Sequence, residues 1–440
     1  AWRPLLLSGS MGPPDAQSNA ACFFGDLACR SLDYTPAAAA FAEGADPMAG
    51  PVPMHGSFER KPDVPDRILF DLDDETFERQ VDNWAELLSS TDAVPDLLHL
   101  HHLTPIHEAA RRVWPDVPVL THLHGTELKM LALAHGPTSG DVAGPYTDQW
   151  VDRMRSWAAD SAHLIVVSVQ DAGLAQQLLP IEPSRVSVVP NGVDIELFAP
   201  RQRTVADRLQ HWKRWLVDDP KGWRPGGDEA SVTYRSEDLA AFTTDDGEAV
   251  PVVVFAGRFM HFKRVWQLVE AHHAMRTGTG RRSVLVIVGG FPGEWEGEHP
   301  FDTAQRLGAD DVFLLGWRNH TELAEILTCC DIFGAPAVDE PFGLVYLEAM
   351  AAGLPPIATS TGGPLSFVNV DPQRPTGWLV APDDVGAITE ALTEAVSDAA
   401  DRSRRGARAA RFVGDHYSWS ACAAAITSLY AGIRESLSSP

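Results

Sequence analysis

The chain has 440 residues and a formal net charge of −25, and residues 1–200 already hold 12 Lys and Arg against 28 Asp and Glu. Nucleic-acid binding needs a basic stripe and peripheral membrane binding needs clustered cations, so this acidic balance argues against both classes. Apolar content of 45% and charged content of 22% are ordinary for a globular protein. At roughly 100–200 residues per domain, the length predicts two domains.

Short apolar runs alternate with helical patterns over residues 1–199, the first predicted domain. A strand within residues 3–10 leads into a Gly-, Pro- and Ser-rich loop, and a helix is expected over residues 19–32. This alternation predicts a parallel sheet with helices on both faces. Further strands are expected within 96–103, 117–125, 163–169 and 185–192, and helices over 74–88 and 147–160.

Residues 200–250 break the pattern, because they are rich in Gly, Pro, Asp and Glu. We interpret them as a linker or insertion that holds one short helix near residues 209–217, since a long structureless stretch inside a compact domain is unusual. The alternation then restarts over residues 251–417, the second predicted domain. A long helical segment over 398–436 follows, and its part 418–440 is expected to pack back on the first domain. The fold class is therefore α/β, with two Rossmann-like doubly wound domains facing one another across a cleft.

The sequence predicts neither a metal site nor a membrane segment. The run "HLHHL" at His99–Leu103 has the look of a metal-binding pattern but lacks Cys or carboxylate partners at ligand spacing, so zinc is not expected. The five cysteines show no metal-like spacing and predict reduced, buried thiols. The opening apolar run is too short for a signal peptide, and no window reaches the ~18–20 apolar residues of a membrane span. We therefore expect a cytoplasmic protein without membrane insertion.

Two carboxylates bracket an apolar run in the segment "EPFGLVYLEAM". Glu340 falls in the loop after a predicted strand, and Glu348 lies about two turns into the following helix, which Gly353 ends. Ligands of open α/β sheets bind at the carboxyl ends of strands, and helix N-termini attract anions. Carboxylates also accept hydrogen bonds from sugar and ribose hydroxyls. The alternative of a surface acid plus an ordinary helix acid stays open for this motif alone.

Two cations follow another predicted strand end. Gly257 is followed by Arg258 and Lys263 in the next loop and helix start, an arrangement that suits a diphosphate. Solvated surface cations are the structural alternative. In the first domain, His124 follows a strand within "THLHGTELK", and the early glycine-rich loop contains Gly9 and Asn19. A structural histidine and an ordinary loop are the alternatives there.

The ordered motifs together are similar to one family. The chain resembles the retaining glycosyltransferases of the GT-B fold, glycosyltransferase family 4, which include mycothiol and phosphatidylinositol sugar transferases. The resemblance covers most of the chain and is strongest in its second half. It rests on Val188–Pro200, Ala256–Lys263, Leu314–Leu323, Glu340–Glu348, Gly377–Asp384 and Tyr417–Tyr430.

The resemblance implies a nucleoside-diphosphate-sugar donor bound mainly by the second domain, with no metal or other cofactor. Arg258 and Lys263 would hold the diphosphate, Glu340 the sugar hydroxyls and Glu348 the ribose. His124 would lie beside the reacting centre. The remaining implied donor contacts are the backbone of Gly257, Phe342, Gly343 and Leu344, the base-lining Trp317 and Arg318, and the loop from Gly9 to Asn19, which would close over donor and acceptor.

Three segments depart from the family pattern: the first loop lacks a Gly-Gly pair, the loop 288–300 is long and acidic, and the insertion after Pro200 is long. We expect retaining transfer to a small soluble polar acceptor, in specialised metabolism or in the assembly of a low-molecular-weight thiol or aminosugar. The alternatives of the same fold that stay open are a sugar-nucleotide 2-epimerase, a phosphorylase and a non-catalytic sugar-nucleotide sensor. A homodimer is an assembly that the sequence neither requires nor excludes.

Overall fold

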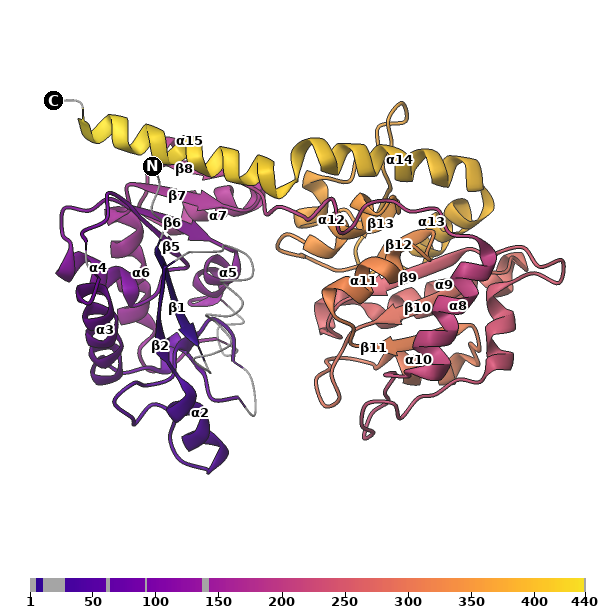
Figure 1. Ribbon diagram of the computed structural model, residues 1–440, viewed down its shortest axis with the longest axis horizontal. Coiled ribbons are helices and arrows are strands. Elements are labelled where there is room, and N and C mark those ends of the chain that lie inside the picture. The colour runs from indigo at the N-terminus through magenta and orange to yellow at the C-terminus, as the bar shows by residue number, and fades with distance from the viewer. Residues whose placement is uncertain (1–4, 11–27, 61–63, 92, 137–141, 439–440) are drawn as a thin grey trace. The chain divides into compact units, whose positions relative to one another are not determined.

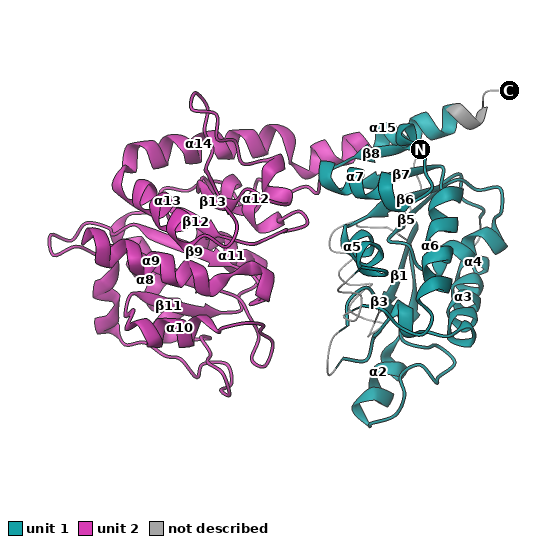
Figure 2. Cartoon of the chain, turned by 180° about the vertical axis from the view of Figure 1, so that it is seen from behind, with its two compact units in different colours: residues 1–189, 427–440 teal, residues 190–426 magenta. Residues whose placement is uncertain are grey.

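The structure is a computed structural model that describes residues 5–10, 28–60, 64–91, 93–136 and 142–438. The chain forms two compact units, which Figure 2 shows in teal and magenta. Unit 1 comprises residues 1–189 and 427–440, and unit 2 comprises residues 190–426. Both unit boundaries therefore differ from the domain limits expected at residues 199 and 417.

Unit 1 is built on a parallel sheet in the order β5-β6-β7-β8. Its helices lie between these strands in the chain, as the alternation predicts (Figure 1). The strand β1 (Leu5–Ser10) pairs in parallel with β2 (Ala28–Asp33) in a separate sheet. The other elements are α2 (Thr35–Ala42), β3 (Gly56–Ser57), β4 (Arg67–Ile68), α3 (Asp74–Ser89), β5 (Leu98–His101), α4 (Ile106–Val113), β6 (Val119–Leu123), α5 (Thr126–Leu133), α6 (Thr147–Asp160), β7 (His163–Val166), α7 (Val169–Leu178) and β8 (Val186–Val188).

Two helices of unit 1 match the sequence pattern closely. Helix α3 begins after Asp73, whose carboxylate accepts a hydrogen bond of 2.8 Å from the backbone N–H of Thr76. Helix α6 buries Trp150 and Trp157 in the core, and the indole of Trp150 donates to the carbonyl of Leu72 at 2.8 Å. The periodic apolar face of each helix therefore packs onto the sheet, which is why these two predictions are confirmed.

The helix expected over residues 19–32 is wrong in its last part. Residues 28–33 form strand β2, in register with β1 from Leu5 to Ser10. Arg30 and Asp33 are exposed while Leu32 packs toward the core. The earlier part of the expected helix, with Asn19, lies outside the described residues.

Unit 2 contains a six-stranded parallel sheet in the order β11-β10-β9-β12-β13-β14. The order reverses direction between β9 and β12, and in such sheets this switch point is where ligands bind. Its elements are α8 (Val205–Lys213), β9 (Val252–Ala256), α9 (Val265–Thr279), β10 (Val284–Val288), α10 (Pro300–Leu307), β11 (Val312–Gly316), α11 (His320–Leu327), β12 (Ile332–Ala335), α12 (Leu344–Ala351), β13 (Pro356–Thr359), β14 (Trp378–Val380), α13 (Val385–Ser397) and α14 (Ala399–His416).

The segment 200–250 is not an exposed linker. It forms α8, a π-helical turn over Arg214–Asp218 and a 3-10 helix over Ser236–Phe242, all within unit 2. Three tryptophans of the segment are fully buried, namely Trp212, Trp215 and Trp223. Burying a large aromatic side chain stabilises a fold by roughly 1.5–3 kcal/mol, so these residues fix the segment on the sheet despite its polar composition.

The terminal helical segment divides into two helices. Helix α14 ends at His416, and α15 spans Trp419–Ser438. Between them the carbonyl of Tyr417 accepts from the backbone N–H of Val193 at 2.8 Å, and Ser418 forms a β-bridge with Val193. This local pairing replaces helical hydrogen bonds, which is why one predicted helix becomes two. The part of α15 from residue 427 onward belongs to unit 1.

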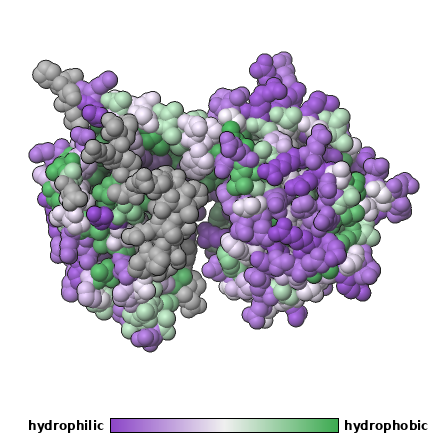
Figure 3. Space-filling model, in the orientation of Figure 1, coloured by the Kyte–Doolittle hydropathy of each residue, from purple (hydrophilic) through white to green (hydrophobic). Residues whose placement is uncertain are grey.

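The cysteines and the surface agree with the composition. Cys329, Cys330 and Cys422 are buried free thiols and Cys29 is a half-buried one, while Cys22 lies outside the described residues. Burial raises the pKa of Cys329 to about 11, so this thiol stays protonated. Within the described residues, none of the helices combines the length and apolar content that crossing a membrane requires. On the face drawn in Figure 3, unit 2 is largely hydrophilic.

Candidate active site

A cavity of about 390 Å³ opens in unit 2 at the carboxyl ends of β9, β10 and β12. Its position is the switch point of the sheet, because residues that follow β9 and β12 both contribute to its wall. The cavity brings together many of the residues predicted from the sequence, although they are spread over about 90 positions of the chain. The predicted residues in its lining are Gly257, Arg258, Lys263, Trp317, Arg318, Glu340, Gly343, Leu344 and Glu348.

Lys263 and Glu340 form an ion pair inside this cavity. Their side chains are only 14% and 10% exposed. Lys263 ends the short 3-10 turn His261–Lys263, which places its ammonium group beside the loop after β12. In the ligand-free chain each charge therefore neutralises the other, and an anionic ligand would compete with Glu340 for the ammonium group.

Arg258 contributes an unengaged positive charge. It is exposed, it lines the cavity, and its guanidinium has no ion-pair partner among the residues that the structure describes. Gly257, the residue before it, has φ +150° and donates its N–H to the carbonyl of Val288 at 3.0 Å. The glycine thus lets the chain turn sharply from β9 so that Arg258 faces the cavity.

The start of helix α12 forms another part of the wall. Gly343 precedes the helix with φ +91°, and a Cβ there would lie 2.7 Å from the ring of Tyr346. Glycine is therefore required at this close turn. The first N–H groups of the helix, at Leu344 and Val345, have no partner within the helix and carry the positive end of its dipole. Phe342 is buried below this turn and does not line the cavity.

Glu348 is buried and held by a histidine that the sequence analysis did not single out. The Nε2 atom of His320 lies 2.8 Å from Oε1 of Glu348. His320 is the first residue of α11, whose preceding Asn319 forms a capping box with Glu322. The pattern "NHTE" was a local signal for this helix start, but only the fold reveals that it faces Glu348. The histidine fixes the carboxylate orientation at the cavity wall.

Two aromatic rings flank the cavity mouth. The rings of Phe291 and Trp317 are stacked with centroids 5.7 Å apart and planes 28° apart. They remain 42% and 44% exposed, which is unusual for such large apolar side chains. Phe291 belongs to the acidic loop 288–300 and Trp317 follows β11. Exposed aromatic faces beside a polar cavity suit a planar ring such as a nucleobase.

The loop 288–300 rests on an aromatic cluster supplied partly by the 200–250 segment. Trp223 packs against His299 with ring centroids 4.4 Å apart and against Phe259 at 5.6 Å. Trp295 forms a backbone β-bridge with Phe259. The carboxylate of Glu296 accepts a hydrogen bond of 2.9 Å from the backbone N–H of His261. The loop is therefore anchored at its base while Phe291 stays exposed.

Arg318 lies in the loop that borders the cavity, and its guanidinium binds protein groups. The residue lines the cavity, but its side chain is fully buried. The guanidinium donates to the carboxylate of Asp219 at 2.6 Å and to the carbonyl of Trp215 at 3.0 Å. It thus ties the 200–250 segment to the loop after β11.

Unit 1 contains a second cavity, of about 370 Å³. Its wall is largely aromatic and hydrogen-bonding, and Gln80 donates to the carbonyl of Met54 at 2.7 Å while its own oxygen has no partner among the described residues. Gly9 lies at this cavity, where a Cβ would collide with Tyr34. The lining is completed by His55, Gly56, Ser57, Phe58, Leu69, Trp84, His102, Thr104 and Pro105.

His124 lies just after β6 in unit 1. Its Nε2 is 2.8 Å from Nδ1 of His101, and its backbone N–H donates to the buried carboxylate of Glu127 at 3.1 Å. Burial, reinforced by the neighbouring His102 and His101, lowers the pKa of His124 to about 4. The imidazole is therefore neutral near pH 7 and can donate or accept one hydrogen bond at each nitrogen.

The fold defines a two-domain GT-B protein, with Rossmann-like α/β units and a cavity at the carboxyl ends of the strands of unit 2. The family model "Glycosyl transferases group 1" matches residues 240–412, and the model "Glycosyltransferase Family 4" matches residues 59–197. The chain is 31% identical to "D-inositol 3-phosphate glycosyltransferase 2" of Catenulispora acidiphila over 78% of its length and 72% of that protein. It is also 31% identical to "D-inositol 3-phosphate glycosyltransferase" of Stackebrandtia nassauensis, over 73% of its length and 66% of the relative.

A solved structure supports the same fold. The crystal structure of HepE from Anabaena in complex with UDP and glucose has a TM-score of 0.62 to this chain at 15% identity, covering 97% of this chain and 91% of that one. The chain belongs to the GT-B glycosyltransferases of family 4. The chain spans less than two thirds of the length of the Stackebrandtia relative.

Proposed function

We propose that the protein transfers a sugar, with retention of anomeric configuration, from a nucleoside-diphosphate sugar to a small polar acceptor. The observation that carries the proposal is the cavity of unit 2, which places two cations, a helix N-terminus and two carboxylates around one space. Cations and N–H groups suit a diphosphate, and carboxylates suit hydroxyls. These groups meet where the sheet of unit 2 reverses its strand order.

Each part of the donor has a matching group. Arg258, Lys263 and the N-terminus of α12 face the diphosphate, and Glu348 accepts from the ribose hydroxyls while His320 holds it in place. Glu340 exchanges its contact with Lys263 for a sugar hydroxyl when the ammonium group turns to a phosphate. The exposed rings of Phe291 and Trp317 stack on the base.

The chemistry follows from the same charges. The acceptor oxygen attacks the anomeric carbon from the face that the diphosphate leaves, so the new bond forms on the side of the broken one. The departing phosphate oxygen takes the acceptor proton, and Arg258 and Lys263 stabilise its negative charge. This scheme needs neither a carboxylate nucleophile nor a metal at the diphosphate, in contrast to the paired-carboxylate glycosidases.

The acceptor is proposed to occupy the cavity of unit 1. Its wall combines the aromatic faces of Tyr34, Phe58 and Trp84 with the polar groups of Gln80 and His102. Among the described residues, this lining contains no lysine or arginine. We therefore favour a neutral polyhydroxylated acceptor, as in thiol or aminosugar assembly or specialised metabolism, over the phosphorylated acceptor in the names of the inositol 3-phosphate relatives. A cytoplasmic location fits such substrates.

The test is a thermal-shift screen with UDP-, GDP-, ADP- and dTDP-sugars, followed by NMR of the product made with a panel of polyols and aminosugars. Arg258→Ala is expected to abolish the donor-induced shift, while Arg281→Ala, another exposed arginine of unit 2, leaves it unchanged. A product with inverted configuration, or no donor binding, contradicts the proposal. Release of nucleoside diphosphate without acceptor would identify an epimerase, and binding without turnover would identify a sensor.

A further inference from the structure

Four histidines gather on one face of the sheet of unit 1. His99 and His101 alternate along β5, and His122 and His124 alternate across the end of β6. Residues two apart on a strand share a face, and the register pairs His101 with His122. The strand pairing therefore brings together side chains from "HLHHL" and "THLHG" that are separate in the sequence. The run His99–Leu103 alone offers no Cys or carboxylate at ligand spacing, which is why the sequence alone does not predict zinc. The fold adds His122 from the neighbouring strand.

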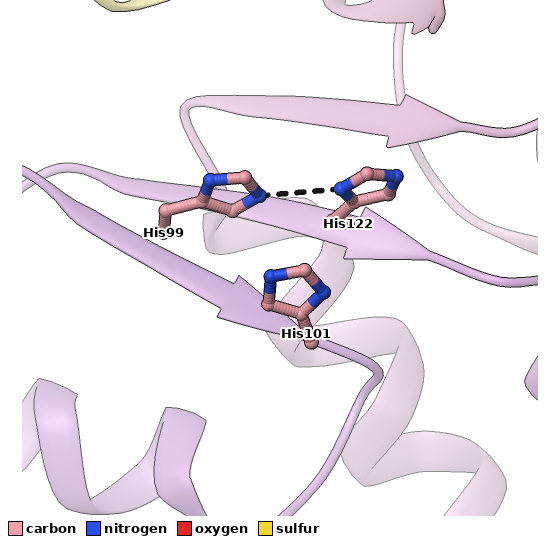
Figure 4. A group of neighbouring side chains, drawn as sticks. All are labelled: His99, His101 and His122. Carbon is pink, nitrogen blue, oxygen red and sulfur yellow. Dashed lines mark hydrogen bonds between the residues drawn. The ribbon is translucent and has the colours of Figure 1, made fainter. Parts of the chain in front are cut away.

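The spacing of three of these side chains fits a metal ion. One ring nitrogen from each of His99, His101 and His122 lies within 4.8 Å of the other two. Nε2 of His99 and Nδ1 of His122 are 3.3 Å apart, and Figure 4 shows these two rings edge to edge with His101 beside them. Two nitrogens at about 2.0–2.1 Å from a tetrahedral ion are separated by about 3.3 Å. His101 is exposed, so a change in its side-chain torsion can bring its nitrogen closer.

The outer nitrogens of the cluster are already oriented. Nδ1 of His99 lies 2.6 Å from the hydroxyl of Tyr430, which comes from α15. Nδ1 of His101 lies 2.8 Å from Nε2 of His124. Ligating histidines almost always use their second nitrogen in this way, which fixes the ring and its tautomer. Nε2 is thereby left as the ligating atom of both His99 and His101.

The burial of His122 in the cluster leaves one of its ring nitrogens without a hydrogen bond among the described residues. His122 is only 4% exposed, and this nitrogen is Nε2. A buried polar atom without a partner is unfavourable, so placing this ring in the cluster has a cost. Burial, and then the repulsion of the other histidines, lowers the pKa of His122 to about 2, and burial lowers that of His99 to about 4. Both rings are neutral near pH 7, the form that binds metal ions.

We propose that His99, His101 and His122 bind one divalent late transition-metal ion, for which Zn²⁺ is the test ion. Imidazole ligands suit Zn²⁺, Ni²⁺ and Cu²⁺ better than Mg²⁺ or Ca²⁺. Three protein ligands leave a fourth position for water. The ion would join β5 to β6 and, through the contact of His99 with Tyr430, to α15. The site lies in unit 1, whereas the donor cavity is a feature of unit 2, and the proposal does not rest on the proposed function.

The experiment titrates chelator-treated full-length protein with Co²⁺ and with Zn²⁺. Visible d–d absorption reports the coordination of Co²⁺, and calorimetry reports the affinity and stoichiometry of Zn²⁺. We expect one ion per chain and intense, tetrahedral-type Co²⁺ bands. His99→Gln and His122→Gln should each weaken binding at least tenfold and remove the bands, while Tyr430→Phe should weaken binding about 10- to 100-fold with the bands retained. His135→Gln, at a surface histidine of the same unit, should bind as the wild type does.

Circular dichroism and thermal melting identify variants that fail to fold. If His122→Gln does not fold, His101→Gln serves instead, because its side chain is exposed. Stoichiometric binding that survives His99→Gln and His101→Gln together overturns the proposal. The proposal is also overturned if the wild type binds Zn²⁺ no more tightly than the double variant does, because the binding is then adventitious binding to surface groups.

Discussion

Replacing Lys263 with methionine should separate two roles of the ammonium group, donor binding and charge balance. In the donor complex the substitution removes one charge-assisted contact to the diphosphate. Such contacts contribute about 1.5–3 kcal/mol, which corresponds to a roughly 10- to 150-fold weaker Kd for a nucleoside diphosphate. The aliphatic part of methionine keeps most of the volume of the lysine stem, so the cavity wall is preserved.

In the free protein the same substitution leaves Glu340 charged and without its cation, with a side chain only 10% exposed. Because some exposure remains, we expect a loss of about 1–3 kcal/mol in the unfolding free energy of unit 2, below the figure for a fully buried pair. This corresponds to about 2–4 °C in Tm per kcal/mol. The double variant Lys263→Met with Glu340→Gln removes both charges and should recover the stability but not the affinity.

The assays are calorimetric titration with the nucleoside diphosphate that gives the largest thermal shift, and thermal melting followed by circular dichroism. Lys213→Met is the matched control, since Lys213 forms an ion pair with Asp218 on the surface with its side chain 49% exposed. Exposed pairs contribute about 0–1 kcal/mol, so the control should change neither quantity appreciably. The reasoning is refuted if the double variant regains donor affinity, or if Lys263→Met binds within twofold of the wild type.

Three more outcomes are expected. Folding lowers the pKa of His99 from 6.5 to about 4 and that of His122 to about 2. Below about pH 6.5 the unfolded chain therefore binds more protons than the folded chain, and the Tm of unit 1 should fall as the pH drops toward 4. A Tm that stays constant from pH 7 to pH 5 would contradict this. Gly289→Ala places a Cβ 2.3 Å from the carbonyl oxygen of Gly257 at φ +113°, so it should lower Tm by several degrees and weaken donor binding, whereas Gly278→Ala in α9 meets no atom and should not destabilise the protein. Phe291→Ala should weaken nucleotide binding by about 1–3 kcal/mol in calorimetry and leave the Tm unchanged. If the wild type and the variant each bind nucleotide and inorganic pyrophosphate with equal affinity, a base does not stack on this ring.

The sequence was most informative where strands and helices alternate regularly. The β-branched runs of β9 to β13 and the turn residues after them could be located by pattern alone, so the position of Arg258, Lys263, Glu340 and Glu348 at strand ends followed from the order of elements. The sequence could not show that Lys263 and Glu340 pair with each other, because this contact depends on how β9 and β12 lie side by side.

Other features depended on contacts between distant segments. The polar composition of residues 200–250 suggested a linker, but three buried tryptophans and the carboxylate of Asp219, bound by Arg318, hold the segment on unit 2. The histidine cluster of unit 1 likewise arises from the register of β5 and β6, which no local spacing in either strand reveals. Tyr417 divides the terminal helix because its backbone pairs with Val193, a residue more than 200 positions away.

The loop 288–300 is anchored by buried aromatic residues at one end and exposed to solvent at the other. Its support is the packing of Trp223, Phe259 and His299, while Phe291 at its other end remains in solvent. Under the proposed function, exchanging the few residues around Phe291 should therefore change which base the cavity accepts without lowering the Tm of unit 2.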